Sequence, residues 1–234
     1  MLGVSRLRVS FGRFEALGGI DLDVADGERV GLVGPNGSGK TTLLDAISGL
    51  VRPASGGVAI GGRPTLGFSP DAIARLGVAR CFQTPRLFER MTVLLNARAG
   101  QYGRGGTAGD GDEPLGLLER CGLGPLRDRL AAELPPAARR RLELARALAA
   151  RPRLLLLDEP CSGLAAAETE EAVALLQWAA SGRTLVIVEH RLPVLRRLCS
   201  RLVVLDRGRI VADGSPATVE AGRALTDAYL GRRV

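Results

Sequence analysis

The sequence predicts one α/β domain over residues 1–234, built on a mostly parallel sheet covered by helices on both faces. Short apolar runs typical of buried strands occur at residues 28–33, 153–157 and 184–188. Stretches with helical spacing follow these runs. We expect residues 1–83 and 151–234 to form the α/β core with an N-terminal antiparallel β subdomain. Residues 84–150 are expected to form a helical subdomain.

The first part of the chain is expected to be rich in strands. Apolar and polar residues alternate at 7–11 and 20–24, as in half-buried strands. Asp26 and Gly27 then give a hairpin-type turn signal ahead of the strand at 28–33. The elements expected next are a helix at 41–50, a strand at 58–60, a helix at 71–76 and a strand at 78–82.

The remainder becomes helical from Met91 and then returns to alternating strands and helices. The glycine-rich stretch at 102–112 predicts a mobile surface loop. In the helix expected at 138–150, leucines and alanines form an apolar stripe with arginines on the other positions. The other expected elements are helices at 115–121, 167–180 and 192–199 and strands at 153–157, 184–188, 202–205 and 210–212.

A phosphate-binding motif lies between the strand at 28–33 and the helix at 41–50. Residues 34–41 read Gly-Pro-Asn-Gly-Ser-Gly-Lys-Thr and fit the P-loop pattern G-x-x-x-x-G-K-[ST]. The glycines let successive N–H groups converge on an anion, and the helix N-terminus adds partial positive charge. This context predicts a P-loop NTPase core of the RecA-like type. The residues expected to bind the nucleotide are Gly34, Pro35, Asn36, Gly37, Ser38, Gly39, Lys40, Thr41 and Thr42.

Lys40 is the only lysine of the chain, although 32 residues are basic. A compact, flexible ammonium suits the β- and γ-phosphates better than a planar guanidinium. The hydroxyl of Thr41 can ligate Mg²⁺.

Polar residues follow three other expected strands. The leucine run at 154–157 ends in Asp158 and Glu159, at the sheet edge where α/β proteins bind ligands. We expect Asp158 to hold Mg²⁺, directly or through water, and Glu159 to polarise a water in line with the γ-phosphate. Gln83 can reach Mg²⁺ or water without adding charge. His190, the only histidine, can contact the γ-phosphate or the attacking water.

Composition narrows the function classes. The net charge of +7 permits nucleic acid or an acidic membrane surface as a partner, but 3% aromatic residues offer few stacking platforms to RNA. The four cysteines form no C-x-x-C pair, so we expect reduced thiols and no zinc. Because no apolar run reaches the length of a signal peptide or a membrane span, another chain would have to cross the membrane.

The P-loop, Gln83, the acidic strand end at 154–159 and His190, in this order and spacing, resemble the nucleotide-binding subunit of an ABC transporter. The resemblance covers essentially the whole chain. Five stretches are similar to the ATP-binding subunits of importers for branched-chain amino acids and for urea or short amides. They are GLVGPNGSGKTTLLDAISG, GVARCFQTPRLFERMTV, RLELARALAARPRLLLLDEP, VIVEH and DAYLG. Two further stretches are slightly more similar to the ATPases of the urea type: LRVSFGRFEALGGIDLDV and DEP-x-x-G-x(4)-ET. Both cargo classes stay open, because the ATPase does not touch the cargo.

The resemblance implies ATP and Mg²⁺ as cofactors. It implies that Glu159 and His190 are catalytic and that the metal-site residues are Thr41, Gln83 and Asp158. It implies that Phe11 stacks on adenine, with Phe14 as a competing candidate.

The resemblance also implies partners. Two ATP-binding subunits would form a dimer that sandwiches ATP between one P-loop and the other subunit's signature motif. Transmembrane permease subunits would dock along residues 83–88, which begin at Gln83 and end at Phe88. The subunit would lie peripherally on the cytoplasmic face of the plasma (inner) membrane, and no nucleic acid is expected.

The signature motif departs from the family. Where the family has Leu-Ser-Gly-Gly-Gln or Leu-Ser-Tyr-Gly-Gln, residues 134–138 read Leu-Pro-Pro-Ala-Ala, and proline removes backbone N–H donors. The D-loop, which usually carries an aspartate, has Ala165. Of a homodimer and a heterodimer, we expect the heterodimer, in which another chain supplies the intact signature. The alternatives are a weakly hydrolytic regulatory subunit and a soluble ABC ATPase acting on nucleic acid or ribosomes.

Overall fold

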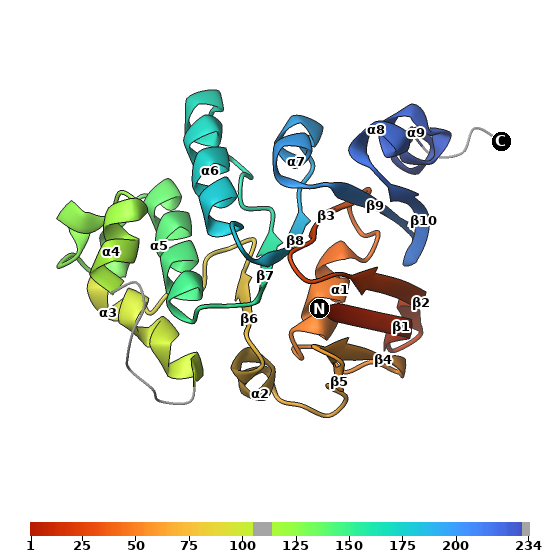
Figure 1. The fold of residues 1–234 in the computed structure, drawn as a ribbon, viewed down its shortest axis with the longest axis horizontal. Coiled ribbons are helices and arrows are strands. Elements are labelled where there is room, and N and C mark those ends of the chain that lie inside the picture. The colour runs from red at the N-terminus through yellow and green to blue at the C-terminus, as the bar shows by residue number, and fades with distance from the viewer. Residues whose placement is uncertain (105–113, 231–234) are drawn as a thin grey trace.

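The computed structural model describes residues 1–104 and 114–230. Two sheets and the helices around them confirm the predicted α/β class (Figure 1). Most of the glycine-rich stretch predicted as a surface loop at 102–112 lies outside the described residues.

The smaller sheet is antiparallel and has the strand order β2-β1-β4-β5. It consists of β1 (Leu2–Phe11), β2 (Phe14–Val24), β4 (Ser55–Ile60) and β5 (Arg63–Pro64). The first two strands are longer than the sequence predicts. Both alternate between buried and exposed positions over much of their length, as expected for strands with one solvated face.

The larger sheet has the order β10-β9-β3-β8-β7-β6 and is parallel except for the edge strand β10. Its strands are β3 (Arg29–Val33), β6 (Val78–Cys81), β7 (Leu154–Asp158), β8 (Thr184–Val188), β9 (Arg201–Asp206) and β10 (Arg209–Gly214). The leucine run of β7 is buried on both faces. Leu154 and Leu156 join one hydrophobic cluster, while Leu155 and Leu157 join the other.

The predicted hairpin at Asp26 and Gly27 is wrong. β2 pairs with β1 in the smaller sheet, whereas β3 lies between β8 and β9 in the larger sheet. The turn connects two sheets, and the Gly27 N–H donates to Thr184 Oγ1 on β8 at 2.9 Å. β3 is an apolar strand buried in the sheet centre, so parallel neighbours on both sides complete its burial better than one antiparallel partner would.

Helices cover both faces of the larger sheet (Figure 1). On one side α1 (Lys40–Ile47) lies between the two sheets and buries Leu43, Leu44 and Ile47. On the other side lie α6 (Ala166–Ala179) and α7 (Leu192–Leu198), followed by α8 (Pro216–Ala221) and α9 (Arg223–Leu230) near the C-terminus. Of these four helices, α6 and α7 match the helices predicted at 167–180 and 192–199, whereas α8 and α9 were not predicted.

The chain between β6 and β7 forms what we call the helical group: α3 (Val93–Ala99), α4 (Pro114–Arg120) and α5 (Pro136–Ala149). Three short 3-10 turns accompany it, at Gly100–Arg104, Gly124–Leu126 and Ala131–Glu133. The group lies at the β6 edge of the larger sheet, on the opposite side of the molecule from α9, and α2 (Pro70–Arg75) lies near it (Figure 1). Within the described part of the chain, every helix is too short or too polar to cross a bilayer.

Candidate functional site

The phosphate-binding loop joins β3 to α1 and is held by close backbone packing. Gly34 and Gly39 have φ angles of +147° and +104°. A Cβ on Gly34 would lie 2.0 Å from the carbonyl oxygen of Leu205, and one on Gly39 would lie 2.9 Å from that of Ala16. A larger residue at either position would therefore push the loop away from the strands that shape it.

Lys40, the first residue of α1, is only 5% exposed. Its Nζ donates to the carbonyl oxygens of Gly34 and Pro35, each at 2.8 Å. Burial lowers the pKa of Lys40, while the negative charges of Glu159 and Asp158 act in the opposite direction. The ammonium thus lies within the curve of the loop, close to where the loop N–H groups would hold an anion.

Asp158 ends β7 and is 2% exposed. Its Oδ1 accepts a hydrogen bond from Thr41 Oγ1 at 3.3 Å, and its Oδ2 accepts one from Arg80 Nη2 at 3.2 Å. Burial raises the pKa of Asp158, and the neighbouring Arg80 charge opposes that rise. The facing oxygens of Thr41 and Asp158 are hard donors of the kind that Mg²⁺ takes.

Mg²⁺ binds many nucleotide sites through only one or two protein side chains, because phosphate oxygens and waters supply the other ligands. The Thr41–Asp158 pair fits that donor set. In the described part of the chain, no group of three or more His, Cys, Asp or Glu side chains is arranged to hold a metal without such help.

Glu159 brings the predicted site residues together. Its Oε1 lies 2.8 Å from His190 Nε2, and its Oε2 accepts a hydrogen bond from Gln83 Nε2 at 3.0 Å. Its backbone φ of +49° is unusual for a residue other than glycine and costs about 1–3 kcal/mol. The surrounding contacts maintain this conformation, including the bond from the Glu159 N–H to the carbonyl of Val188 at 2.9 Å. The Gln83 side chain donates its hydrogen bond to this carboxylate and not to Thr41 or Asp158.

A groove of about 800 Å³ opens in front of the P-loop. Its walls bring residues of the loop, Thr42 among them, together with Gln83, Glu159 and His190. Phe11 and Phe14 line the same groove and are 53% and 63% exposed. Both rings are available to a planar group in the groove, so the geometry does not choose between them.

Sequence reasoning missed residues of α5 that hold this site. Arg140 Nη1 donates to the backbone carbonyls of Glu159 at 3.1 Å and Gln83 at 3.3 Å. Glu143 is 1% exposed and accepts from the N–H groups of Phe82 and Arg86, which lie on either side of Gln83. Burial raises the pKa of Glu143, and those two N–H groups partly offset the effect. The amphipathic pattern of α5 carries no signal that distinguishes these side chains from solvated ones.

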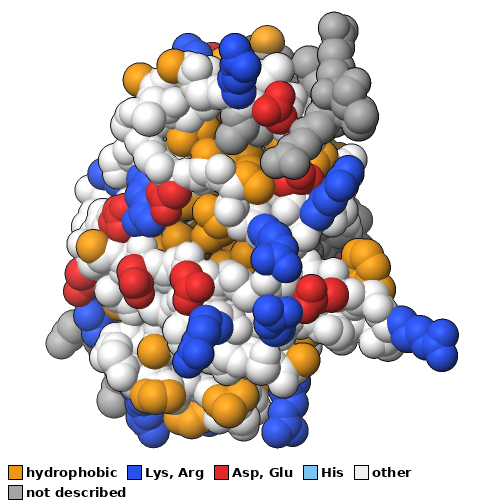
Figure 2. All heavy atoms as spheres, turned by 90° about the vertical axis from the view of Figure 1, so that its right-hand side faces the viewer, with side chains coloured by type: hydrophobic (Ala, Val, Ile, Leu, Met, Phe, Trp, Pro, Cys, Tyr) orange, Lys and Arg blue, Asp and Glu red, His pale blue; other side chains and the backbone are white. Residues whose placement is uncertain are grey.

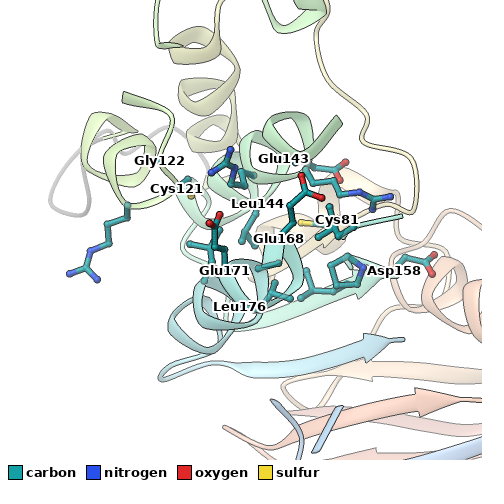
Figure 3. A pocket seen from close by; sticks show the side chains of 18 of the residues that line it. Cys81, Cys121, Gly122, Glu143, Leu144, Asp158, Glu168, Glu171 and Leu176 are labelled. Carbon is teal, nitrogen blue, oxygen red and sulfur yellow. The ribbon is translucent and has the colours of Figure 1, made fainter. Parts of the chain in front are cut away.

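A second pocket, of about 280 Å³, lies between α4 and α5 of the helical group and α6 of the core (Figure 3). Glu143 and Leu144 from α5, Glu168 and Leu176 from α6, and Asp158 line it. Figure 3 shows Asp158 on the side of the pocket that faces α1. The helical group therefore does not fill the space beside the end of β7 completely.

The stretch at the signature position forms the start of α5. Pro135 is the N-cap residue and Pro136 is the first residue of the helix. A helix start normally presents several unpaired N–H groups, and here two of those positions have none. The first N–H groups belong to Ala137 and Ala138, and the Arg139 N–H already bonds the Pro135 carbonyl at 3.0 Å.

The comparisons with known proteins agree with this geometry. Residues 17–162 match the model of the family described as ABC transporter. The chain belongs to this family. It is 34% identical to the high-affinity branched-chain amino acid transport ATP-binding protein BraF of Pseudomonas aeruginosa, with 99% of this chain and 98% of the relative covered. The corresponding protein LivG of Escherichia coli is 32% identical with the same coverage.

Solved structures of ABC cassettes have the same fold. A nucleotide-free ATP-binding cassette from an ABC transporter superposes with a TM-score of 0.86 at 29% identity, covering 99% of both chains. A dimeric cassette in a post-hydrolysis state, bound to ADP and Pi, superposes with a TM-score of 0.82 at 26% identity, covering 92% of this chain and 99% of that one. This ABC protein is accordingly a nucleotide-binding ATPase subunit, which confirms the resemblance seen in its sequence.

Proposed function

We propose that this chain hydrolyses ATP for an importer whose membrane subunits are separate chains, and that branched-chain amino acids are its cargo. The observation that carries the proposal is Glu159, held between His190 and Gln83 at the mouth of the P-loop groove. The cargo rests on BraF and LivG, which are named for branched-chain amino acid transport. Urea or short amides are the second candidate, on the motifs that lean toward the urea type.

In the proposed mechanism the P-loop N–H groups and Lys40 bind the β- and γ-phosphates. Thr41 and Asp158 would hold Mg²⁺, and the ion would supply positive charge that neutralises those phosphates. Glu159 accepts a proton from the attacking water or polarises it, because its carboxylate lines the groove in front of the P-loop. His190 and Gln83 fix the direction of that carboxylate through their hydrogen bonds to its two oxygens.

We further propose that the functional unit is a heterodimer. A related bacterial cassette has a dimeric structure. In the sandwich that the family resemblance implies, the α5 N-terminus of one subunit would face the ATP of the other. The two prolines remove N–H donors from that end, and no serine hydroxyl or glutamine amide replaces them. This chain would therefore receive an intact signature from its partner and return a weak one.

The proposed contact with the permeases runs along residues 83–88 and continues into α3. Phe88, Met91 and Leu95 are 50%, 41% and 48% exposed, and large apolar side chains gathered in one short segment favour a protein partner. Through Gln83, this segment is one hydrogen bond from Glu159, so nucleotide chemistry and docking would share a structural element. The subunit would then lie peripherally on the cytoplasmic face of the membrane.

Nucleic acid is not favoured as the partner. Binding to a phosphate backbone uses a basic stripe or patch. On the face shown in Figure 2, acidic and basic side chains are interspersed with apolar ones. Arg201 is paired with Asp213 and Glu28, so its charge is compensated locally.

The test of the heterodimer compares single-turnover ATP hydrolysis by the chain alone with hydrolysis in a mixture with a partner ATPase that has an intact signature. We expect slow turnover alone and stimulated turnover in the mixture. The matched variant restores the signature through Pro135→Ser, Pro136→Gly, Ala137→Gly and Ala138→Gln, and it should gain activity without the partner. Full ATPase activity of the unaltered chain alone would contradict the heterodimer proposal.

The cargo is tested by reconstituting the complex with its permeases in vesicles and measuring uptake of labelled leucine and labelled urea. ATP-dependent leucine uptake supports the first candidate. Urea uptake without leucine uptake would overturn it.

A further inference from the structure

A buried arginine on β6 connects three parts of the nucleotide site. Arg80 lies beside Leu156 of β7 in the parallel register, and its side chain is only 5% exposed. Arginine is rarely buried to this extent unless its charge is paired, because desolvating a guanidinium is costly. The groups that pair with the Arg80 guanidinium therefore indicate the role of this residue.

Two carboxylates share the Arg80 guanidinium. Nη1 donates to Asp45 Oδ1 at 2.5 Å and to Ser48 Oγ at 3.0 Å, and both acceptors belong to α1 or its C-cap. Nη2 donates to Asp158 Oδ2 at 3.2 Å. The flat face of the group lies over the Phe82 ring, with 4.7 Å from Cζ to the ring centroid.

These contacts divide the oxygens of Asp158 between two tasks. Oδ2 is bonded to Arg80, which leaves Oδ1 facing Thr41 Oγ1 at 3.3 Å. A carboxylate bound at one oxygen by a rigid planar donor has little freedom to rotate. Because Asp45 anchors the same guanidinium to α1, the helix that carries Thr41 and the strand that carries Asp158 are connected through it.

We propose that Arg80 is a positioning residue for Mg²⁺. It holds Oδ2 of Asp158, turns Oδ1 toward the Thr41 hydroxyl and so raises the affinity for magnesium-bound nucleotide. The inference rests on the proposed role of Asp158 as a metal-site residue. Arg80 itself does not touch the nucleotide. Lysine cannot replace it fully, since one ammonium does not span both carboxylates with the same fixed geometry.

The experiment measures the dissociation constant of a fluorescent ATP analogue in EDTA and in Mg²⁺, using the full chain. We call the dissociation constant in EDTA divided by the dissociation constant in Mg²⁺ the magnesium increment. In Arg80→Gln we expect the increment to fall by about tenfold, the size of one charge-assisted hydrogen bond, while the affinity in EDTA changes by less than about twofold. Arg80→Lys should recover part of the increment.

Arg201→Gln is the matched control, because Arg201 also bridges two acidic residues, Asp213 and Glu28, away from the groove. It should lower the thermal stability but keep the magnesium increment. If Arg80→Gln fails to fold, Arg80→Lys decides, and an unchanged increment in it would overturn the inference.

Asp158→Asn separates this inference from the proposed function. Loss of the increment in Asp158→Asn but not in the Arg80 variants would refute the role of Arg80 and leave the metal site standing. An unchanged increment in Asp158→Asn would refute the metal site itself, and the Arg80 inference with it. Equal loss of affinity with and without Mg²⁺ in Arg80→Gln would show a general structural role and also count against the inference.

Discussion

Replacing Glu143 with alanine tests how the helical group holds Gln83 in place. The Glu143 carboxylate accepts hydrogen bonds from the N–H groups of Phe82 at 3.1 Å and Arg86 at 2.9 Å. Alanine leaves both donors without that acceptor, and a buried unsatisfied donor costs about 1–3 kcal/mol. The two donors together therefore set a range of about 2–6 kcal/mol.

Two effects place the expected decrease in the free energy of unfolding in the lower part of that range. Removing Glu143 also removes a desolvated carboxylate, whose burial raises its pKa. The side chain lines the pocket of about 280 Å³, so water can enter and reach the freed N–H groups. We expect the free energy of unfolding to fall by about 3 kcal/mol, which lowers Tm by roughly 6–12 °C for a protein of this size.

The assay is urea unfolding followed by circular dichroism, with ATP binding and hydrolysis measured on the same samples. Because Gln83 lies between the two freed N–H groups, we expect kcat to fall while the affinity for ATP is kept. Glu133→Ala, an exposed glutamate near the start of α5, is the control and should leave stability within about 0.5 kcal/mol. A Glu143→Ala variant as stable as the control would refute the reasoning.

The same substitution carries a pH signature. The native pKa of Glu143 is raised above its ordinary value of 4.5, so the folded state binds this proton more tightly than the unfolded state. This tighter proton binding adds to the free energy of unfolding. The contribution is fully present below pH 4.5 and is lost as pH rises through the raised pKa. The difference in stability between wild type and Glu143→Ala should therefore widen as pH falls through this window.

The remaining predictions concern the reaction, the adenine site and the thiols. Glu159→Gln should keep ATP binding and abolish hydrolysis, and unchanged turnover in a single-turnover assay would refute its role. Phe11→Ala or Phe14→Ala should weaken binding of a fluorescent ATP analogue by roughly tenfold, the size of one stacking contact, and the variant with the loss identifies the stacking ring. The native thiols should react slowly with a disulfide reagent at pH 8 and rapidly after unfolding, and fast native labelling would contradict this. The reason is burial, which raises the pKa to about 12 in Cys121, Cys161 and Cys199.

Features that depend on neighbours along the chain could be predicted before the fold was known. The P-loop could be predicted because its strand, its glycines and the helix starting at Lys40 are contiguous. The meeting of Gln83, Glu159 and His190 could also be predicted, since each follows a strand and the carboxyl ends of parallel strands share one edge of the sheet. Strand type followed from the apolar runs, because strands buried on both faces need no alternation.

The distant groups that satisfy the buried polar atoms could be identified only from the folded chain. The turn at Gly27 reads as a hairpin locally, yet it connects two sheets because strand pairing is settled by burial of the whole strand. Arg80 is separated from Asp158 by 78 positions and Glu143 from Phe82 by 61, so no local period connects them. A buried charge is satisfied by whatever side chain the fold brings within hydrogen-bond distance, and that distance is set by the packing of β6, α1 and α5.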